Sequence, residues 1–257
     1  MLFYFSGTGN SRHVAQQIAA ATSDAPTSIA AGAFRRDDLR QRDTLILVFP
    51  VYAWGPPTVV EQFLDLFPKA LAKDVARTYV VMTCGDDVGR ADRIAEKRLR
   101  AKGLELSGIW SVQMPNTYTA LPGFDVDPEP LAKEKLTRAA ARTAAIIQAI
   151  AQRQTNIRDV HPGLLPWTKS HILRPLFRRF LTSPRRFRVS ATCTHCHRCQ
   201  RVCPLSNISW DAATDTPRWN THCTTCFACY HQCPTRSIDN GRWTRGKHQY
   251  AGPEAQV

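Results

Sequence analysis

The first 155 residues alternate between short apolar runs and longer amphipathic stretches. The chain opens with "MLFYF", and runs rich in apolar residues recur as "TLILVFPVY", "RTYVVMTCG" and "LELSGIWSVQM". Their length and composition are typical of strands that are covered on both faces in a parallel sheet. We therefore predict a buried strand at each of these places.

Amphipathic stretches separate the predicted strands. In "RHVAQQIAAAT" and "PTVVEQFLDLF" the apolar residues recur at helical spacing, and "VGRADRIAEKRLRAKG" is a charged helix that Gly103 can end in a left-handed conformation. A long helix starts after Asp127, with Pro128 at its first position. Strands joined by such helices need crossover connections, so residues 1–155 are predicted to form an α/β domain with a parallel sheet that carries helices on both faces.

Residues 156–189 break this pattern and are interpreted as a basic connector. They hold eight Lys or Arg residues against a single Asp, together with five prolines and glycines. We expect one apolar helical row to pack on a neighbouring domain; contact of residues 171–188 with an acidic partner or a membrane surface is the alternative. The row comprises Ile172, Leu173, Leu176, Phe177, Phe180 and Leu181, with Arg178 and Arg179 outside it.

Eight of the nine cysteines lie in two runs of identical spacing, "CTHCHRCQRVCP" and "CTTCFACYHQCP", within residues 190–257. Three cysteines at two-residue gaps wrap one four-iron cluster, and in two-cluster ferredoxins the cysteine before proline ligates the other run's cluster. This rule predicts two [4Fe-4S] clusters in a small α+β module of the bacterial ferredoxin type. One set is Cys193, Cys196, Cys199 and Cys233, and the other is Cys223, Cys226, Cys229 and Cys203.

Two alternatives concern the surroundings of these cysteines. Structural zinc is the competing metal, but zinc sites usually join two CxxC pairs rather than repeat a run of three. Nearby histidines are interpreted as solvated side chains or hydrogen-bond donors to cluster sulfur, because eight thiolates already fill both sites. These histidines are His195, His197, His222 and His231.

A glycine-bearing turn, "FSGTGNSRH", lies between the first predicted strand and helix. Backbone N–H groups and the positive end of a helix bind phosphate at such a position. The turn contains neither the Gly-Lys-Ser/Thr of a nucleoside triphosphate loop nor the third glycine of a dinucleotide fingerprint. We predict a monophosphate site there, the alternative being close helix packing alone; its residues are Ser6, Gly7, Thr8, Gly9, Asn10 and Ser11.

Two further loops follow predicted strands at the same edge of the sheet, where ligands of doubly wound folds bind. "PVYAWGPP" offers aromatic rings on which a flat ligand would stack, and "TCGDDVG" is rich in glycine. Ordinary core packing of the two rings is the alternative. The candidate ligand-binding residues are Pro50, Val51, Tyr52, Trp54, Thr83 and Gly85.

Together with "MPNTY" and the two cysteine segments, these motifs resemble the EFR1-type ferredoxin family, which joins a flavodoxin-like domain to a two-cluster ferredoxin module. The resemblance implies FMN held by residues 6–11, its ring between loops 50–55 and 83–87, and Tyr118 near it. The sequence departs from the family pattern by placing His197 and Phe227 where glycine is common, Thr117 where Asn is usual, and Asp86 and Asp87 where small residues are usual.

The formal charge of +13 suggests nucleic-acid binding, but clusters and a flavin phosphate would reduce it to roughly +7. No secretory signal or membrane span is evident, so we expect a cytoplasmic protein. We expect an electron carrier between redox partner proteins, acidic ones among them; a flavin-dependent oxidoreductase is the alternative, and nucleic-acid binding is the least favoured class. No catalytic acid, base or nucleophile is expected, and Cys84 is interpreted as a small buried residue.

Overall fold

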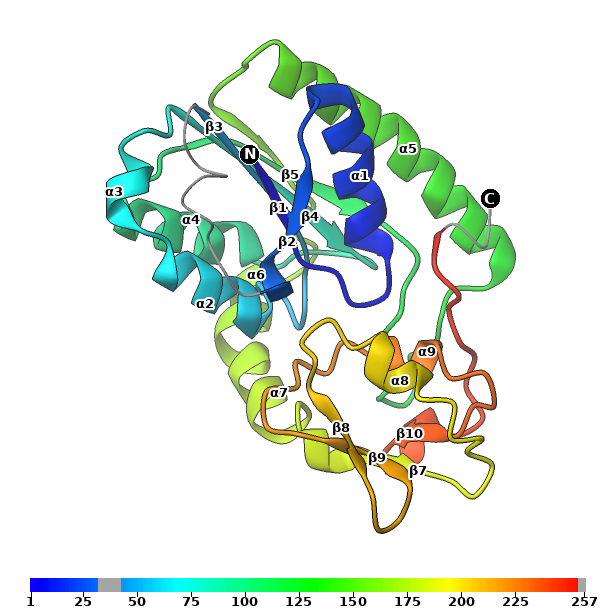
Figure 1. Ribbon diagram of the computed structural model, residues 1–257. Helices are drawn as coiled ribbons and strands as arrows, with labels where there is room; N and C mark the ends of the chain where they lie inside the picture. The colour runs from blue at the N-terminus through cyan, green and yellow to red at the C-terminus, as the bar shows by residue number, and fades with distance from the viewer. Residues whose placement is uncertain (32–42, 254–257) are drawn as a thin grey trace.

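Six parallel strands form the main sheet, in the order β2-β1-β3-β4-β5-β6 (Figure 1). The structure is a computed structural model that describes residues 1–31 and 43–253. The strand order reverses at β1, which confirms the parallel sheet predicted from the alternating pattern and the doubly wound, flavodoxin-like order that the family resemblance implies. The strands are β1 Leu2–Tyr4, β2 Pro26–Ser28, β3 Thr44–Pro50, β4 Arg77–Cys84, β5 Leu106–Gln113 and β6 Ile157–Asp159.

Helices cover both faces of this sheet (Figure 1). Residues of β3 alternate between the two cores: Leu45, Leu47 and Phe49 pack with the α2 and α4 side, and Ile46 and Val48 pack with the α1 and α5 side. This alternation explains why the strand is apolar throughout. The helices are α1 Asn10–Thr22, α2 Thr58–Leu66, α3 Lys69–Ala72, α4 Ala91–Ala101 and α5 Glu129–Ala151.

Most element boundaries agree with the sequence pattern. Gly103 follows α4 with a φ of +83°, as predicted for a left-handed helix end. Pro128 precedes α5 as its cap instead of occupying the first helical position, which shifts the start of that helix by one residue. The pattern missed β2, a three-residue strand of half-buried residues.

The predicted connector is shorter than residues 156–189, because strands at both of its ends belong to the adjoining domains. β6 pairs with β5, with Gly108 opposite Ile157, and so completes the main sheet. β7 Phe187–Val189 pairs with β10 Ile238–Asn240 in the C-terminal module. Three-residue strands carry too little periodicity to be recognised from sequence; only pairing defines them.

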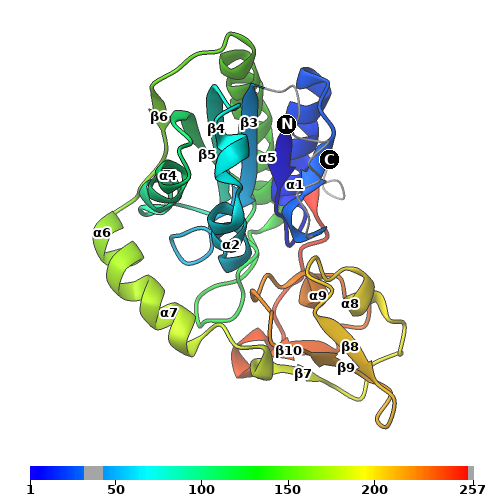
Figure 2. The same ribbon diagram turned by 60° about the vertical axis from the view of Figure 1, so that its left-hand side comes forward.

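The connector contains a helix formed by α6 Pro166–Thr168, a π-helical turn over Lys169–Leu173, and α7 Arg174–Phe180. This helix runs along the side of the sheet domain toward the C-terminal module (Figure 2). Its polar side chains Ser170 and Arg174 are buried against the sheet domain.

The expectation that the apolar row of the connector packs on a domain is wrong for most of the row. Ile172, Leu176 and Phe180 are 46, 51 and 65% exposed, whereas the ring of Phe177 lies 5.4 Å from that of Tyr118. Ion pairs and hydrogen bonds, and not the apolar row, decide which side of the helix faces the protein. The exposed row is thus available to a partner or a membrane surface, which were the alternatives considered from the sequence.

The C-terminal module is built from two equivalent halves, each consisting of a cysteine run and a short helix. α8 Arg198–Arg201 follows the first run, α9 Ala228–His231 follows the second, and β8 Ile208–Asp211 pairs with β9 Thr216–Trp219 between them. The halves share their unusual backbone, since left-handed residues recur at matching positions: His195 and Thr225, His197 and Phe227, Ser206 and Arg236. Among the described residues, no helix is long and apolar enough to cross a membrane.

Candidate functional site

The structure brings the eight cysteines of the C-terminal module together in two crossed sets. Cys199 lies close enough to Cys193, Cys196 and Cys233 for their charges to raise its pKa, which burial raises first, to about 11. Cys229 likewise lies in the field of Cys226, Cys223 and Cys203. In both sets the cysteine before proline joins the other run, which is the arrangement that the ferredoxin rule predicts.

The arrangement of these sets bears on the zinc alternative. In the part of the chain that the structure describes, no three His, Cys, Asp or Glu side chains are positioned to hold a single metal ion. Tetrahedral zinc needs its ligands within about 2.3 Å of one point, whereas a four-iron cube takes each thiolate at a separate corner. What favours four-iron clusters is the crossed grouping, in which the last cysteine of each run acts on the cysteines of the other run.

Hydrogen-bond donors point at the sulfurs at equivalent places in the two halves. Asn207 N donates to Cys203 Sγ over 3.3 Å, and Ser237 N donates to Cys233 Sγ over 3.2 Å. Trp219 Nε1 adds a side-chain donor to Cys229 Sγ at 3.4 Å. Such bonds stabilise thiolate charge and tune cluster potential. Trp219 was not recognised from the sequence, because its position depends on the pairing of β8 with β9.

The histidines near the cysteine runs do not all have the solvated or sulfur-directed roles expected. His231 is 4% exposed; its Nε2 lies 2.8 Å from Thr117 O, and its Nδ1 accepts a bond from Tyr250 N. It therefore links the two domains. His197 instead stacks on Trp210 with ring centroids 3.8 Å apart.

The residue after the second cysteine of each run is His197 or Phe227, whereas ferredoxins commonly have glycine there. His197 and Phe227 adopt φ values of 56° and 61°. Glycine is common at such positions because it has no Cβ to oppose a left-handed backbone. Here the stacked imidazole and the buried Phe227 ring occupy these positions, which shields the module's core.

The predicted phosphate turn lies between β1 and α1, and its side chains are used differently from what the sequence suggested. Asn10 Nδ2 donates to Pro115 O, while Asn10 Oδ1 accepts from Tyr250 Oη over 2.6 Å. Ser11 Oγ lies 2.8 Å from Thr83 Oγ1. The side chains of Asn10 and Ser11 thus have partners within the protein, and their backbone N–H groups begin the helix without intrahelical acceptors.

The loop after β3 holds Trp54 in a strained turn. Tyr52 and Gly55 pair across it, and the two residues between them, Ala53 and Trp54, have φ values of 46° and 59°. Two-residue turns of this kind normally use Asn and Gly, and non-glycine residues there indicate strain at a functional position. The connector helix holds the turn, because Ser170 Oγ donates to Trp54 O over 2.8 Å.

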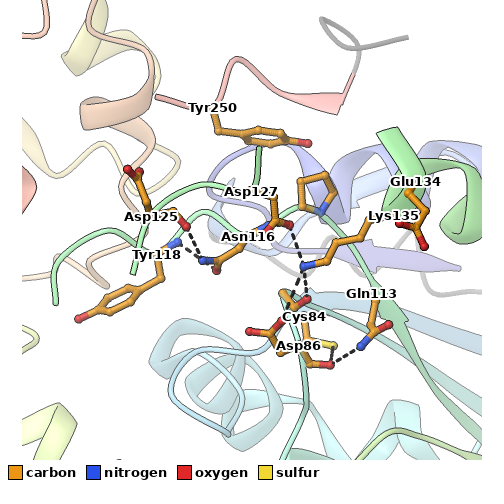
Figure 3. Close-up of polar contacts among 12 residues, drawn as sticks. Cys84, Asp86, Gln113, Asn116, Tyr118, Asp125, Asp127, Glu134, Lys135 and Tyr250 are labelled. Atoms are coloured by element: carbon orange, nitrogen blue, oxygen red, sulfur yellow. Dashed lines mark hydrogen bonds and ion pairs between the residues drawn. The ribbon is translucent and has the colours of Figure 1, made fainter. Parts of the chain in front are cut away.

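The loop after β4 is held by a buried lysine from α5 (Figure 3). Lys135 Nζ donates to Gly85 O over 2.9 Å and pairs with Asp127 Oδ2 at 2.7 Å. The two aspartates that depart from the family pattern are both paired. Asp87 meets Lys169 Nζ at 2.5 Å, and Asp86 lies 3.6 Å from Lys135 Nζ. Lys169 and Lys135 therefore offset the negative charges of Asp87 and Asp86 in this loop.

One cavity unites these loops with the second cysteine run. All the sequence-predicted ligand residues except Gly9 line it, and so do Tyr118, Thr224, Thr225 and Cys226. The two domains meet there without spare room, since a Cβ atom at Gly7 would lie 2.6 Å from Cβ of Cys226. The sequence could not reveal that the C-terminal module forms one wall of this cavity.

The C-terminal segment fixes the two domains to each other. Lys247 Nζ donates to the carbonyl groups of Thr119, Leu121 and Phe124. Tyr250, 1% exposed, reaches Asn10 in the phosphate turn. The segment, red in Figure 1, runs from the C-terminal module up to the sheet domain as the last part of the described chain.

Comparison with known proteins agrees with both halves of this architecture. Residues 1–119 match the flavodoxin domain family, and residues 186–234 match the 4Fe-4S dicluster domain family. The chain joins a flavodoxin domain to a 4Fe-4S dicluster domain. This combination supports a redox role as an iron-sulfur flavoprotein. No curated protein matches the chain.

Solved structures with similarity to part of the chain include three proteins. The Trp repressor binding protein from Bacillus subtilis is 17% identical, with 44% of this chain and 82% of that chain covered and a TM-score of 0.37. A flavodoxin from Streptococcus pneumonia TIGR4 is 18% identical, with 56% and 97% covered and a TM-score of 0.33. The NAD(P)H:quinone oxidoreductase from Methanothermobacter marburgensis is 14% identical, with 56% and 94% covered and a TM-score of 0.34.

Proposed function

We propose that this protein transfers electrons between FMN, bound in the flavodoxin domain, and two [4Fe-4S] clusters, bound by the crossed cysteine sets. The observation that carries the proposal is the shared cavity: Cys226, a cysteine of the second run, lines the same space as the phosphate turn. When bound, the flavin exchanges one or two electrons and each cluster exchanges one, which would connect two-electron and one-electron carriers.

The residues of the cavity fit FMN chemically. Thr8 and the backbone of residues 6–11 offer neutral donors at the start of α1, which suits a monophosphate. Tyr52 and Trp54 lie on one loop and Gly85 on the other, so an aromatic ring system would fit between them. Tyr118 also lines the cavity.

The two cysteine sets differ in their access to solvent. The set nearer the flavin loop contains Cys226, which lines the cavity and whose pKa burial raises to about 12. The other set contains Cys196, which is exposed and has a lowered pKa because the backbone N–H of Arg198 and the side chain of Thr194 favour its thiolate. The order in the fold therefore runs from the flavin loop to the set with Cys226 and then to the set with Cys196.

We propose that a redox partner binds at the surface around Cys196, because this cysteine is exposed. Arg198 and Arg201 lie on α8 beside it and are exposed. Complementary charge accelerates encounter between proteins, so an acidic one-electron carrier would bind here. By contrast, Lys169, Arg174 and Arg178 of the connector pair with carboxylates of the same chain, which weakens the nucleic-acid reading of the positive charge.

Anaerobic purification with quantitation of iron, sulfide, zinc and released flavin on one sample tests the cofactors. We expect about eight irons and about one FMN per chain, as two four-iron clusters and one flavin site require. Zinc in place of iron would refute the redox function, and iron without flavin after reconstitution would reduce the flavodoxin domain to a docking module.

The partner surface is tested by stopped-flow reduction with a small acidic ferredoxin as the probe. The double variant Arg198→Glu and Arg201→Glu should slow the second-order rate and reverse its dependence on salt, because attraction becomes repulsion. Arg138→Glu, on the exposed side of α5, is the control. Equal slowing by the control would show a general charge effect and not a docking site.

A flavin-dependent oxidoreductase remains the second candidate, favoured by the extent of the cavity. It continues past the flavin loops to apolar side chains at Leu121, Phe124 and Phe177, which would accept a small apolar substrate beside the ring. Multiple turnovers of a quinone or azo dye with dithionite as donor would support this function. If each protein molecule reduces only about one molecule of the dye or quinone, the result would support the electron-carrier function.

A further inference from the structure

The connector helix turns a row of large apolar side chains away from the protein. Ser170 and Arg174, four residues apart, are buried against the sheet domain and fix the inward side of the helix. Ile172 and Leu176 each follow by two residues, which is a rotation of roughly 200° about the helix axis. Phe180 continues the same row one turn later, and all three side chains are exposed. The anchoring contacts therefore hold the apolar row in solvent.

The exposed apolar face begins before the helix does. Leu164 and Leu165 precede α6 and are 84 and 72% exposed. Trp167, in the first turn, is also exposed, and its ring stacks on that of His171 with centroids 5.1 Å apart. Exposed apolar faces of this extent on a folded protein mark a binding surface for another protein or a membrane.

The charges around this face are positive. Residues 160–210 contain nine Lys or Arg residues and neither Asp nor Glu. Arg179 and Arg185 are exposed, and in the part of the chain that the structure describes neither forms an ion pair. The guanidinium of Arg179 lies 5.9 Å from the ring centroid of Phe180, so free positive charge adjoins the apolar row. The three basic residues of the helix that do pair with carboxylates are Lys169, Arg174 and Arg178.

This combination fits a lipid surface. Helices that lie in the plane of a membrane interface bury leucine, phenylalanine and tryptophan among the lipids and place basic residues against anionic headgroups. The connector helix lies on the outer edge of the molecule, where a flat surface can approach it along its length (Figure 2). A protein partner would have to offer a groove matched to the row, whereas a fluid lipid surface adapts to it.

We propose that the apolar row of the connector helix, together with Arg179 and Arg185, binds the surface of membranes that contain anionic lipids. The helix then lies in the interface, and the two redox domains stay in water beside it. Membrane binding by this row requires no flavin, so it goes beyond the proposed electron transfer and is tested separately from it.

The test is sedimentation of the cluster-loaded full chain with vesicles under anaerobic conditions. One vesicle preparation is phosphatidylcholine alone, and the other contains phosphatidylcholine and phosphatidylglycerol in equal amounts. Wild-type protein should bind the anionic vesicles more tightly than the neutral ones, and added salt should weaken this binding because it screens the headgroup charge.

The apolar row is tested by the double variant Leu176→Gln and Phe180→Gln. Glutamine preserves helix propensity, and both positions are exposed, so the fold should be unchanged. Binding to the anionic vesicles should weaken at least about tenfold, because two large apolar side chains no longer enter the interface. The matched control is Leu66→Gln with Leu131→Gln, which changes exposed apolar residues of α2 and α5.

The charges are tested by the double variant Arg179→Gln and Arg185→Gln. It should weaken binding to the anionic vesicles about thirtyfold, equivalent to about 2 kcal/mol, and leave binding to the neutral vesicles unchanged. Lys133→Gln with Arg138→Gln, which removes two exposed charges from α5, is the control. Circular dichroism and iron content should be equal in all variants.

Wild-type protein that stays in solution with both kinds of vesicle would overturn the proposal. Equal binding to the two kinds of vesicle, or equal losses in the variants and their controls, would also overturn it. If vesicles do not bind but a small acidic ferredoxin forms a complex that only the row variant loses, the face belongs to a protein partner instead.

Discussion

Glu61 is a buried carboxylate that anchors the connector helix, so Glu61→Gln should release that helix. Glu61, 4% exposed, meets Arg174 Nη2 at 2.8 Å and Arg178 Nη1 at 3.1 Å. Arg174 is itself buried and also donates to Pro56 O in the loop after β3. The substitution keeps the side-chain size but leaves Arg174 as a buried cation without its counter-charge.

The magnitude follows from the burial of the two pairs. Breaking a buried pair from one side costs about 3–5 kcal/mol, while the half-exposed Arg178 pair adds about 1 kcal/mol or less. With a urea m value of about 2–3 kcal/mol/M for a domain of this size, the unfolding midpoint of the flavodoxin domain should fall by about 1–2 M. Before global unfolding, the connector helix should exchange its amide hydrogens faster, because its main anchor is lost.

The matched control is Glu105→Gln. Glu105 is 80% exposed and lies 3.9 Å from Arg100, so its loss should change stability by less than about 1 kcal/mol. Urea unfolding monitored by circular dichroism and hydrogen exchange over residues 164–181 provide the two measurements. Equal midpoints for the two variants, with unchanged exchange in the helix, would show that Glu61 does not hold the connector.

Three further predictions concern the sites themselves. Cys203→Ser should remove the cluster next to the flavin loop and leave the other, so iron content should fall by about half; loss of the exposed cluster instead would refute the crossed ligand sets. Lys135→Met should weaken FMN binding about tenfold, because a hydrogen bond to a charged group contributes about 1.5–3 kcal/mol to the loop that holds Gly85; Lys133→Met, exposed on the same helix, is the control, and equal titration curves would contradict the role. Cys84 should resist iodoacetamide at pH 8 in the folded protein, because burial raises its pKa to about 12 and keeps the thiol protonated; rapid labelling of that residue would disprove the assignment.

The elements of this protein that follow from local pattern were predictable from its sequence. β3 is apolar throughout because both of its faces are covered, and this shows directly in "TLILVFP". The cysteine runs predict cluster binding because three ligands of one cluster come from a single loop. In both cases the informative feature is local: a continuous apolar segment in β3 and closely spaced cysteines in the two runs.

The orientation of the connector helix was not predictable, because it depends on contacts with residues far away in the sequence. Its apolar row suggested a packed face, yet the helix turns Ser170 and Arg174 inward. The partner that decides this orientation, Glu61, is 113 residues away from Arg174 in the sequence. Helical periodicity shows that a helix has two faces, but the ion pair between Arg174 and Glu61 determines which face is buried.

The sequence by itself therefore determined the α/β sheet and the C-terminal cysteine module. Only the tertiary structure decided that the second cysteine run, and not the first, lines the cavity beside the turn between β1 and α1. The two runs are nearly equivalent in spacing and backbone, so local forces cannot distinguish them. The contact of Cys226 with Gly7 and the links made by His231, Lys247 and Tyr250 distinguish them, because these join residues more than a hundred positions apart.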